Sequence, residues 1–504
     1  MNFLLDRFPY STYQAVSEAL LAEGHRVALT VLTQQSKFSA LNLPKNCFYD
    51  HQIARGMVTY NVPNVLSREH LEKASTYEGL AIGVFARYSI GQRNFSAQEM
   101  SSHYFELYNF WLYHVLDKKI NFCFHHYVPH DPSSFVLYVV LKAMKIPSVY
   151  VDTPHIFNRY RFLSCSFTDR TLLLSSSQNS QNFDFRGASS RFGHSLRLNM
   201  EESIPKPIRF RTAREKDKKI HTAIKLLNFK FMDIFRVIGF ILRLNKPAGH
   251  LFKLSRRRWS SSKSEFNKVY YSIFFLYQKI LLRIKLKQYE LKCSTELTPG
   301  RYLYFAMSAQ PEGSTLPTAL AYKDVFTVLR AIRTALPSNI KIVYKENPSM
   351  FELRNPYISA VNYRSSDYYD QILDIGNVQL VSTTHDSTEL IKNAYCVATI
   401  NGTVAIEAVH FGVPAITFGS NWYDQVDGIL RFENNDDLAK KLLHLDNYHP
   451  VPELSNVYLD QNFLIEFDDH DPYEFHGEAR EQLVNAFLRS VEKFRSLGEC
   501  KWSI

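Results

Sequence analysis

Short apolar runs alternate with amphipathic stretches along the first third of the chain. The apolar runs cover residues 2–5, 26–32, 120–127 and 148–151, and segments with helical spacing cover 11–23, 95–116 and 133–144. Short apolar runs bounded by polar residues are typical of strands buried on both faces, and their alternation with helices indicates a mostly parallel sheet. The pattern therefore predicts a first α/β unit over residues 1–165.

A second alternation of the same kind covers residues 300–435. Strands are expected at 302–306, 340–344, 378–381, 395–400 and 415–418, with helices near 322–335, 368–374, 387–393 and 404–411. The segment 436–504 contains a helical pattern at 478–494, which we expect to cross back to the first unit. The expected fold class is α/β, with two Rossmann-like domains facing a cleft.

The segment 166–299 separates the two units. Residues 166–205 are rich in Ser, Asn, Arg and Gly and are expected to form loops, and residues 206–292 form a basic helical insert. This insert holds 23 Lys and Arg against five Asp and Glu, so its net charge is +18. The net charge of the whole chain is +10, so the remaining residues together carry −8. Basic residues interleaved with Phe, Leu and Ile favour an anionic membrane surface. A solvated helical linker is the alternative; no recognised nucleic-acid motif accompanies the charge.

Cysteine usage and hydropathy place the chain in a broad class. Six cysteines are scattered without a CxxC pair, which argues against a disulfide framework and favours a reducing, cytoplasmic compartment. The beginning of the chain lacks the pattern of a signal peptide. The apolar runs at 231–244 and 269–282 are interrupted by charged residues and are too short to span a membrane.

Polar residues follow the predicted strands of the second unit. Ligands of open parallel sheets bind beyond the carboxyl ends of the strands, so these residues are candidates for one site. They are Gln310 and Glu312 after the first strand, Lys345, Glu346 and Asn347 after the second, Ser387 and Thr388 after the third, and Asn401, Gly402 and Thr403 after the fourth. Their convergence predicts a ligand at this edge of the sheet.

The Asn401-Gly402-Thr403 turn predicts a helix start with free backbone N–H groups, which is favourable for an anion. Glu407 lies four residues after Thr403 and therefore on the same helix face. A carboxylate there suits the hydroxyl groups of a sugar or ribose. Simple helix capping is the alternative interpretation.

Two further segments carry candidate chemistry. Glu312 is placed to act as a nucleophile on an anomeric carbon or as a general base, and a helix N-terminal acid is the alternative. The segment His125–Asp131 contains three histidines and an aspartate, which suggests a metal site. Adjacent His125 and His126 point to opposite faces of a continuing strand, so joint ligation is not favoured and we expect no metal.

Four segments in order resemble a known family. They are Tyr302–Ala306 with Gln310-Pro311-Glu312, Val343–Pro348, Gly376–Leu380, and Thr399–Ala408 with Phe411–Ile416. The pattern is similar to bacterial capsule and lipopolysaccharide glycosyltransferases, especially the Kdo-transferase-like capsule polysaccharide biosynthesis proteins. The resemblance covers about 300–430 well and the first 160 residues loosely, and it implies the GT-B layout of two facing Rossmann-like domains.

The resemblance also implies roles for single residues. Lys345 would neutralise a donor phosphate, and Ser387 with Thr388 resembles the hydroxyl pair that grips the phosphate or carboxylate of CMP-sugars, although both also fit an ordinary helix cap. Asn347 stands where the family has a histidine that contacts the nucleotide. His130 and Asp131 would lie on the acceptor side, where either could serve as general base, with a core or capping role as the alternative.

The sequence thus predicts a metal-independent glycosyltransferase of cell-surface polysaccharide synthesis without a cofactor. It would transfer a sugar from a nucleotide-sugar, with a CMP-Kdo-like donor favoured over a UDP- or GDP-sugar, to a glycan or lipid-linked acceptor. Its expected location is cytoplasmic, at the inner face of the inner membrane. A nucleotide-sugar epimerase or hydrolase of the same fold is one alternative. A catalytically degenerate subunit of a capsule-assembly complex is another, because Asn347 replaces the family histidine.

Overall fold

The computed structural model describes most of both predicted units. The described residues are 1–33, 46–50, 53, 59, 62–89, 96–152, 160–165, 268–297, 301–310, 315–352, 363–421, 423–424, 426–445, 464–466 and 477–497. Glu312 and most of the basic insert lie outside these residues, so the predictions made for them are not addressed by the structure.

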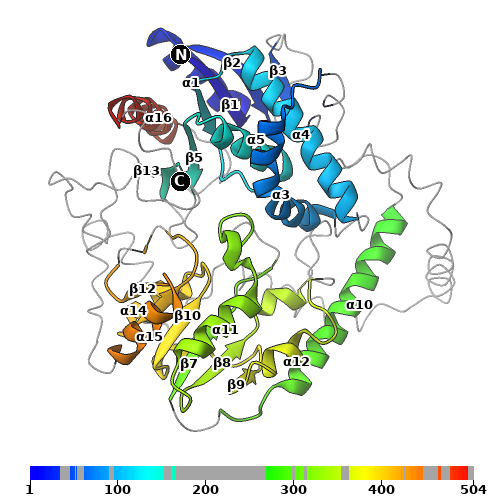
Figure 1. Cartoon of the computed structure of the whole chain (residues 1–504), viewed down its shortest axis with the longest axis vertical. Coiled ribbons are helices and arrows are strands. Elements are labelled where there is room, and N and C mark those ends of the chain that lie inside the picture. The colour runs from blue at the N-terminus through cyan, green and yellow to red at the C-terminus, as the bar shows by residue number, and fades with distance from the viewer. Residues whose placement is uncertain are drawn as a thin grey trace.

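The N-terminal unit is built around one sheet (Figure 1). Its strands are β1 (Asn2–Phe8), β2 (Arg26–Leu32), β3 (Cys47–Tyr49), β4 (Phe122–His125), β5 (Ser148–Asp152), β6 (Tyr160–Ser164) and β13 (Leu464–Glu466), and its helices are α1 (Tyr10–Ala22), α3 (Arg68–Ser89), α4 (Ala97–Asp117), α5 (Pro132–Ala143) and α16 (Gly477–Leu497). Among the described residues the strand order is β13-β6-β5-β4-β1-β2-β3. Strands β1 to β5 are parallel, and β6 and β13 add antiparallel pairs at one edge.

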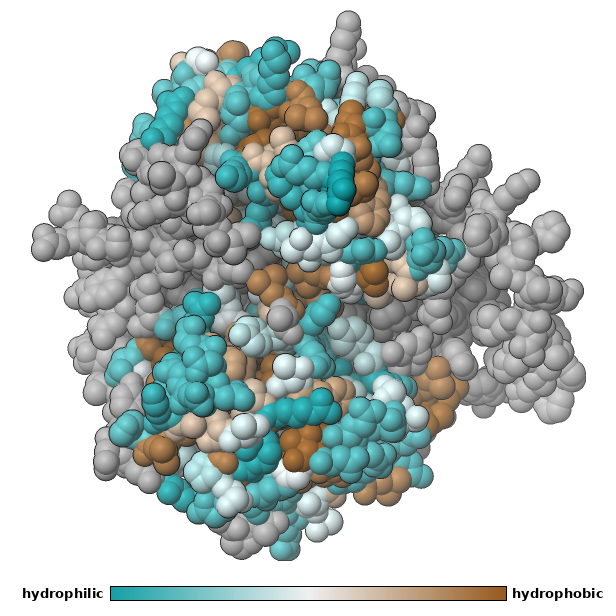
Figure 2. All heavy atoms as spheres, viewed as in Figure 1, coloured by the Kyte–Doolittle hydropathy of each residue, from teal (hydrophilic) through white to brown (hydrophobic). Residues whose placement is uncertain are grey.

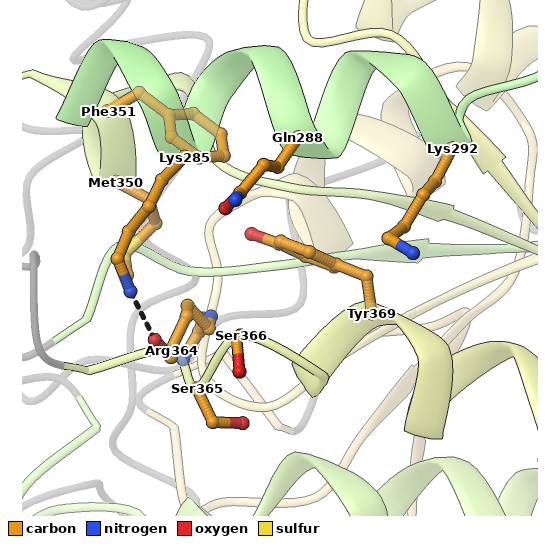
Figure 3. Close-up of a pocket in the computed structure, with 9 residues that line it drawn as sticks. All are labelled: Lys285, Gln288, Lys292, Met350, Phe351, Arg364, Ser365, Ser366 and Tyr369. Atoms are coloured by element: carbon orange, nitrogen blue, oxygen red, sulfur yellow. Dashed lines mark hydrogen bonds between the residues drawn. The ribbon is translucent and has the colours of Figure 1, made fainter. Parts of the chain in front are cut away.

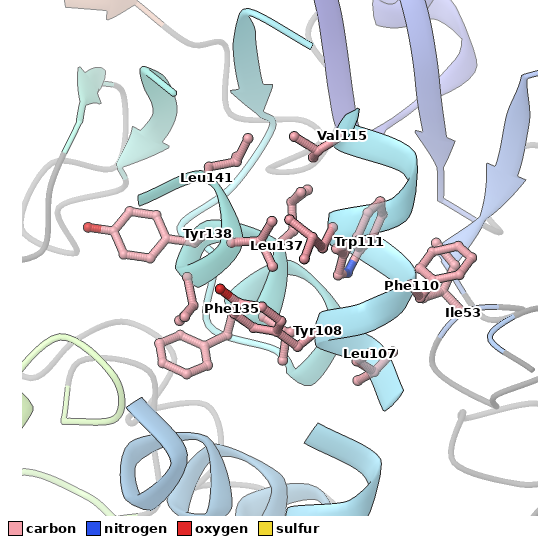
Figure 4. Close-up of a cluster of buried hydrophobic side chains, with 14 of the residues drawn as sticks. Ile53, Leu107, Tyr108, Phe110, Trp111, Val115, Phe135, Leu137, Tyr138 and Leu141 are labelled. Atoms are coloured by element: carbon pink, nitrogen blue, oxygen red, sulfur yellow. The ribbon is translucent and has the colours of Figure 1, made fainter. Parts of the chain in front are cut away.

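One face of this sheet is covered by α3, α4 and α5, whose apolar side chains form a large core (Figure 4). Helix α4 starts at a capping box in which Ser96 and Glu99 satisfy each other's backbone N–H groups. Trp111 is fully buried and donates its indole N–H to the carbonyl oxygen of Ser133, 3.0 Å away. This contact fixes α4 against the start of α5, because a buried indole N–H requires an acceptor.

The opposite face is covered by α1 and α16, which pack on each other and on the sheet. The Phe487 ring of α16 stacks on Phe124 of β4 with ring centroids 4.2 Å apart, and Phe494 lies against Phe122 at 5.4 Å. A helix from near residue 480 therefore completes the hydrophobic core that β1 begins.

The C-terminal unit contains a second, fully parallel sheet. Its strands are β7 (Tyr302–Ala306), β8 (Lys341–Lys345), β9 (Val378–Val381), β10 (Cys396–Thr399), β11 (Ala415–Thr417) and β12 (Ile429–Arg431), and its helices are α10 (Lys268–Lys292), α11 (Val325–Ala335), α12 (Tyr368–Leu373), α13 (Ser387–Lys392), α14 (Val404–His410) and α15 (Asn435–Leu443), with 3-10 turns η5 (Leu320–Lys323) and η6 (Pro348–Phe351). In the described residues the order is β12-β11-β10-β7-β8-β9. Leu438, Leu442 and Leu445 belong to its core, so packing continues past residue 435.

The α/β prediction is confirmed: the molecule consists of two Rossmann-like units, and the predicted strands and helices occur within a few residues of their expected bounds. Helix α10, at the end of the basic insert, is part of the second unit. Tyr289 is fully buried in its core, and its hydroxyl donates to the carbonyl oxygen of Val381 at 2.6 Å. Glu290 accepts from the backbone N–H and the hydroxyl of Thr383. The last turns of α10 thus extend the β9 edge.

The two units meet through α3 and the segment after β7. Arg87 of α3 donates to the carbonyl oxygen of Leu316 at 2.9 Å, and Lys323 donates back to the carbonyl oxygen of Gly79 at 3.3 Å. These partners follow the carboxyl end of β7, so this edge of the second sheet faces the first unit. On the face shown in Figure 2, hydrophilic and hydrophobic side chains are interspersed over both units, as is usual for folded proteins.

No helix in the described ranges combines the length and the apolar character that crossing a membrane requires.

Candidate functional site

The strand order of the second sheet locates its ligand-binding edge. Strands β8 and β9 extend from β7 to one side, and β10, β11 and β12 extend to the other. The order therefore reverses between β7 and β10, and ligands of such sheets bind beyond the carboxyl ends at this point. The segments that follow these two strands contain Gln310 and the Asn401–Thr403 turn. The Thr399 hydroxyl of β10 donates to the carbonyl oxygen of Ala306 at 3.2 Å and joins the two strand ends.

Two glycines allow the turn after β10 to pack closely. The backbone N–H of Gly402 donates to the Thr399 hydroxyl at 3.2 Å, and a Cβ atom on Gly402 would come within 2.6 Å of that oxygen. A Cβ atom on Gly419 would come within 1.6 Å of Asn401 Oδ1. Asn401 also donates to the hydroxyl of Thr318 at 3.2 Å. The Asn401 side chain is therefore held between the end of β11 and the segment that follows β7.

Thr403 is the residue at which α14 begins, but its side chain does not cap the helix. Its hydroxyl lies 3.5 Å from Glu407 Oε1, so the two lie on one face as the sequence predicts. Burial raises the pKa of Glu407 to about 7, and the Thr403 hydroxyl opposes this shift. A carboxyl group that titrates near neutral pH can both donate to and accept from ligand hydroxyl groups.

Lys345 is held at the carboxyl end of β8. Its ammonium group donates to the carbonyl oxygen of His385 at 2.5 Å and to the hydroxyl of Ser387 at 2.7 Å. The Ser387 hydroxyl also interacts with the hydroxyl of buried Tyr304 on β7. The structure thus brings Lys345 and Ser387 together as a cation and a hydroxyl group. Thr388 lies beside them, with its backbone N–H capped by Asp386 at 2.7 Å.

Glu346 has a different environment from the other predicted residues. It has no exposed surface, and its carboxylate accepts from Arg364 Nε at 3.0 Å, Tyr369 at 3.0 Å and Tyr344 at 3.1 Å. Arg364 also donates to Gln310 Oε1 at 2.7 Å. Burial alone would lower the pKa of Arg364, but the Glu346 carboxylate beside the guanidinium holds that pKa well above its ordinary value. Glu346 therefore stabilises the position of Gln310 indirectly, because it binds the arginine that binds Gln310.

Residues 364–366 line a small pocket beneath α10 (Figure 3). Lys285 of α10 donates to the carbonyl oxygen of Arg364, and Tyr369 lies between α10 and this segment. The pocket is therefore near the lateral edge of the sheet that β8 and β9 form, and not at the reversal point between β7 and β10. Arg364 was not identified from the sequence, because its partners are 18 and 54 residues away.

Asn347 forms a local cap in the position where the family has a histidine. Its Oδ1 atom accepts from the backbone N–H of Ser349 at 3.0 Å and begins η6. Its own backbone N–H donates to Glu346 Oε1 at 3.0 Å. Asn347 thus provides the turn geometry of this segment without a group that titrates near neutral pH.

The first sheet has its own point of reversal, between β1 and β4. Arg7 lies near the carboxyl end of β1 and forms ion pairs with Asp131 and, at 3.6 Å, with Asp50. Arg7 has a φ angle of 61°, a conformation that is uncommon for residues other than glycine. Asp131 also caps α5 by accepting from the backbone N–H of Ser134 at 3.2 Å. Burial opposes ionisation of Asp131, but Arg7 and the neighbouring groups hold its pKa below the ordinary value.

His130 lies directly before Asp131 at the same edge. Its Nδ1 atom is 2.6 Å from the carbonyl oxygen of Val128, and because a carbonyl only accepts, Nδ1 carries the proton and Nε2 is the acceptor. Burial lowers the pKa of His130 to about 4, with Arg87 adding to the effect. The ring is therefore neutral at pH 7, with Nε2 able to accept a hydrogen bond from a hydroxyl group.

The other histidines of this segment are in the core. His125 Nδ1 is 2.8 Å from Asp6 Oδ2, and both residues are almost fully buried. The His126 ring packs against Phe8, with ring centroids 5.2 Å apart. Among the residues that the structure describes, no group of three or more His, Cys, Asp or Glu side chains is placed to hold a metal ion.

Several solved structures were found to be similar over part or all of the chain. They include KpsC, a beta Kdo 2,7 transferase from Thermosulfurimonas dismutans, with 13% identity over 44% of this chain and 67% of that chain and a TM-score of 0.23. They also include UDP-GlcNAc 2-epimerases from Neisseria meningitidis (12% identity, 97% and 100% covered, TM-score 0.20) and Methanocaldococcus jannaschii (11% identity, 98% and 99% covered, TM-score 0.24). TM-scores this low do not establish a shared arrangement. No curated protein matches the sequence.

Comparison of the sequence with models of protein families identifies one family. The model of the family described as "Capsule polysaccharide biosynthesis protein" matches residues 320–463. This range begins at η5 and includes Lys345, the Ser387–Thr388 pair and the Asn401–Glu407 turn and helix. It confirms the resemblance to this family, and it covers the last three of the four ordered segments. Residues 320–463 of this chain are thus similar in sequence to the capsule polysaccharide biosynthesis proteins.

Proposed function

We propose that the protein is a GT-B glycosyltransferase of bacterial capsule or lipopolysaccharide synthesis. The observation that carries the proposal is the position of the two sheet reversals: one holds the Asn401–Glu407 region and the other holds His130, and α3 joins their edges. The family match over residues 320–463 supports a role in capsule synthesis. A nucleotide-sugar bound at the second sheet would face an acceptor bound at the first.

The donor half of the proposal assigns a task to each residue. Lys345 and Ser387 would bind a donor phosphate, because they present a cation and a hydroxyl from adjacent strand ends. Thr403 and Glu407 would bind hydroxyl groups of the ribose or sugar. Gln310 would lie beside them, fixed by Arg364. With a cation on the phosphate, the reaction as proposed requires no metal ion.

The acceptor half assigns His130 as the group that orients the acceptor hydroxyl through Nε2, with Asp131 holding Arg7 and the start of α5. Glu312 remains our candidate nucleophile or general base from the sequence. A CMP-Kdo-like donor is favoured by the resemblance, and a UDP- or GDP-sugar transferase or epimerase is the alternative. The acceptor would be a glycan or a lipid-linked glycan.

We further propose that the protein acts at the inner face of the inner membrane and contacts anionic lipid through residues 206–292. The described end of this segment supports the idea. Ile280 and Ile284 are each 48% exposed and Leu291 is 76% exposed, on the side of α10 opposite Tyr289. Arg283 and Lys287 are exposed between them, an amphipathic arrangement typical of helices that lie on membranes.

A catalytically degenerate subunit of a capsule-assembly complex is the second candidate. It is favoured by Asn347, which caps η6 where the family has a histidine. Such a subunit would bind the nucleotide without turnover, or would bind none.

A thermal-shift screen tests the proposed donor. The protein and its Glu407→Ala variant are heated with CMP, CDP, UDP, GDP or ADP, and a ligand that binds the native state must raise the midpoint. Stabilisation by CMP alone that is lost in the variant supports a CMP-sugar donor at this site. Stabilisation by UDP or GDP retains the transferase and replaces the donor. If no nucleotide binds, the proposed transferase is rejected in favour of the degenerate subunit.

A further inference from the structure

One face of helix α3 packs along residues 316–323, which follow β7. Gly79, Gly83 and Arg87 are spaced four residues apart, so they follow one another on this face. The carbonyl oxygen of Gly79 accepts from Lys323, a Cβ atom on Gly83 would lie 3.4 Å from Leu316, and Arg87 donates to the Leu316 carbonyl oxygen. Two turns of α3 thus contact residues 316–323 of the other unit.

Arg87 is the last of these contact residues on α3, and its buried guanidinium binds one carbonyl oxygen from each unit. Only 2% of its surface is exposed. One terminal nitrogen, Nη1, donates to the Leu316 carbonyl oxygen of the second unit at 2.9 Å, and Nη2 donates to the carbonyl oxygen of His130 in the first. The planar guanidinium presents these donors in a fixed fork, which a lysine ammonium group does not. The side chain therefore fixes the positions of two backbone segments from different units relative to each other.

The segment held by Arg87 leads directly to the donor-side turn. Leu316 and Thr318 are almost fully buried, and the Thr318 hydroxyl accepts from Asn401. A continuous chain of contacts therefore runs from His130 through Arg87 and residues 316–318 to Asn401. It connects the reversal point of the first sheet to that of the second.

We propose that Arg87 is a positioning residue for sugar transfer, which sets the position of His130 relative to the donor-side turn at Asn401. This inference rests on the proposed function. Every predicted donor contact lies in the second unit, so loss of Arg87 should leave nucleotide binding intact and impair the transfer step. Misplacement of reacting groups by about 1 Å is enough to lower a rate by about 10²-fold.

The experiment compares Arg87→Ala, Arg87→Lys and Arg68→Ala. Arg68 is the control, because it begins the same helix and forms an exposed i,i+4 pair with Glu72. Turnover is followed as nucleotide release from CMP-Kdo, with UDP- and GDP-sugars in parallel, in the presence of a bacterial glycolipid extract. We expect kcat to fall by about 10²-fold in Arg87→Ala and less in Arg87→Lys, while the dissociation constant of the free nucleotide stays within about twofold of wild type.

A second pair of variants separates positioning from a general loss of folding. Gly83→Leu adds a bulky side chain against Leu316 while the chain keeps its arginine at position 87. Gly83→Ala adds only a Cβ atom at an ordinary contact distance. Gly83→Leu should lower kcat with unchanged nucleotide affinity, and Gly83→Ala should resemble wild type. Wild-type kcat in both Arg87→Ala and Gly83→Leu would overturn the proposal, as would an equal loss of nucleotide affinity in Arg87→Ala.

A readout independent of turnover distinguishes failure of this inference from failure of the proposed function. Amide hydrogen exchange at residues 316–323 and 79–87 reports the contact itself. Faster exchange at both segments in Arg87→Ala, but not in Arg68→Ala, is expected even if no sugar donor is turned over. Unchanged exchange would show that Arg87 does not hold the two units together and would reject the inference.

Discussion

Two glutamates near the second sheet show how surroundings assign different tasks to one type of side chain. Glu346 is fully enclosed, and a guanidinium and two tyrosine hydroxyls compensate its charge. Glu407 is half-buried, with the Thr403 hydroxyl 3.5 Å away, and burial raises its pKa to about 7. The first arrangement stabilises a loop, whereas the second leaves a carboxyl group able to respond to a ligand and to pH.

The raised pKa of Glu407 predicts a pH-dependent stability. Between its ordinary value of 4.5 and about 7, the folded protein keeps a proton that the unfolded chain has released. Stability is therefore lost as pH rises through this range, and the loss is complete above it. Glu407→Gln cannot ionise, so its advantage over wild type should grow by about 1–3 kcal/mol between pH 4.5 and pH 8. Thermal unfolding midpoints measured across this range test it.

Glu389→Gln is the control for this comparison. Glu389 lies in the first turn of α13, as Glu407 does in α14, but it is exposed. Its substitution removes a carboxyl group from the same helix position without the burial on which the prediction rests, so the growing advantage is expected for Glu407→Gln alone. Parallel curves for wild type and Glu407→Gln would contradict the assignment of a raised pKa.

At the scale of elements, α16 shows that position along the chain does not decide which unit a helix stabilises. It follows the second unit in sequence, yet its apolar side chains fill the core under β1 and β4. The strand β13 likewise pairs with β6 of the first sheet. The N-terminal unit therefore depends on residues from both ends of the described chain.

This dependence predicts the effect of Phe487→Ala. The ring is 1% exposed and stacks on Phe124, so its removal leaves a cavity against β4 and should cost about 3–5 kcal/mol of unfolding free energy. Hydrogen exchange should accelerate in β1, β4 and α1, while nucleotide-induced shifts of the second unit persist. Leu443→Ala, at a 68% exposed position, is the control. Acceleration confined to residues 301–445 would contradict this assignment.

At the scale of the whole molecule, charge is distributed unevenly. Residues 206–292 carry +18 and the remaining chain carries −8. An anionic surface would therefore attract this segment of the chain and repel the remainder, which would favour one orientation as well as affinity. The exposed isoleucines of α10 add an apolar component that salt does not screen.

Flotation with vesicles tests this orientation. The protein should float with phosphatidylglycerol-rich vesicles at low salt, float less at about 0.5 M salt, and stay behind with phosphatidylcholine vesicles, because screening weakens charge attraction. Ile280→Ser with Ile284→Ser should reduce flotation at every salt concentration. A protein that stays in the soluble fraction at low salt would exclude the proposed membrane contact.

The sequence predicted the regular elements well because their signals are local. Apolar runs such as 395–400 and the helix start at Thr403 need only neighbouring residues to be recognised. Helix α3 was missed because two glycines and many polar residues weaken its pattern, and β3 because it has three residues.

The contacts that organise the candidate site could not be predicted in the same way. Arg87 meets Leu316 across 229 residues, and Arg364 meets Gln310 across 54. No pattern within a window of the chain encodes such pairs. The sequence identified the residues at the strand ends, but the folded chain was needed to show that Glu346 is internal and that Asn347 is a cap.

The return of α16 to the first unit has a consequence for biosynthesis. Arg495 and His25 are neighbours in the folded protein although 470 residues separate them. A ribosome adding about 5–20 residues per second needs roughly 25 to 100 seconds to make that stretch. During this interval the face of the first sheet that α16 covers is without its partner, so the nascent chain is a candidate client for chaperones that shield apolar surfaces. The first unit to be synthesised would then be the last to finish folding.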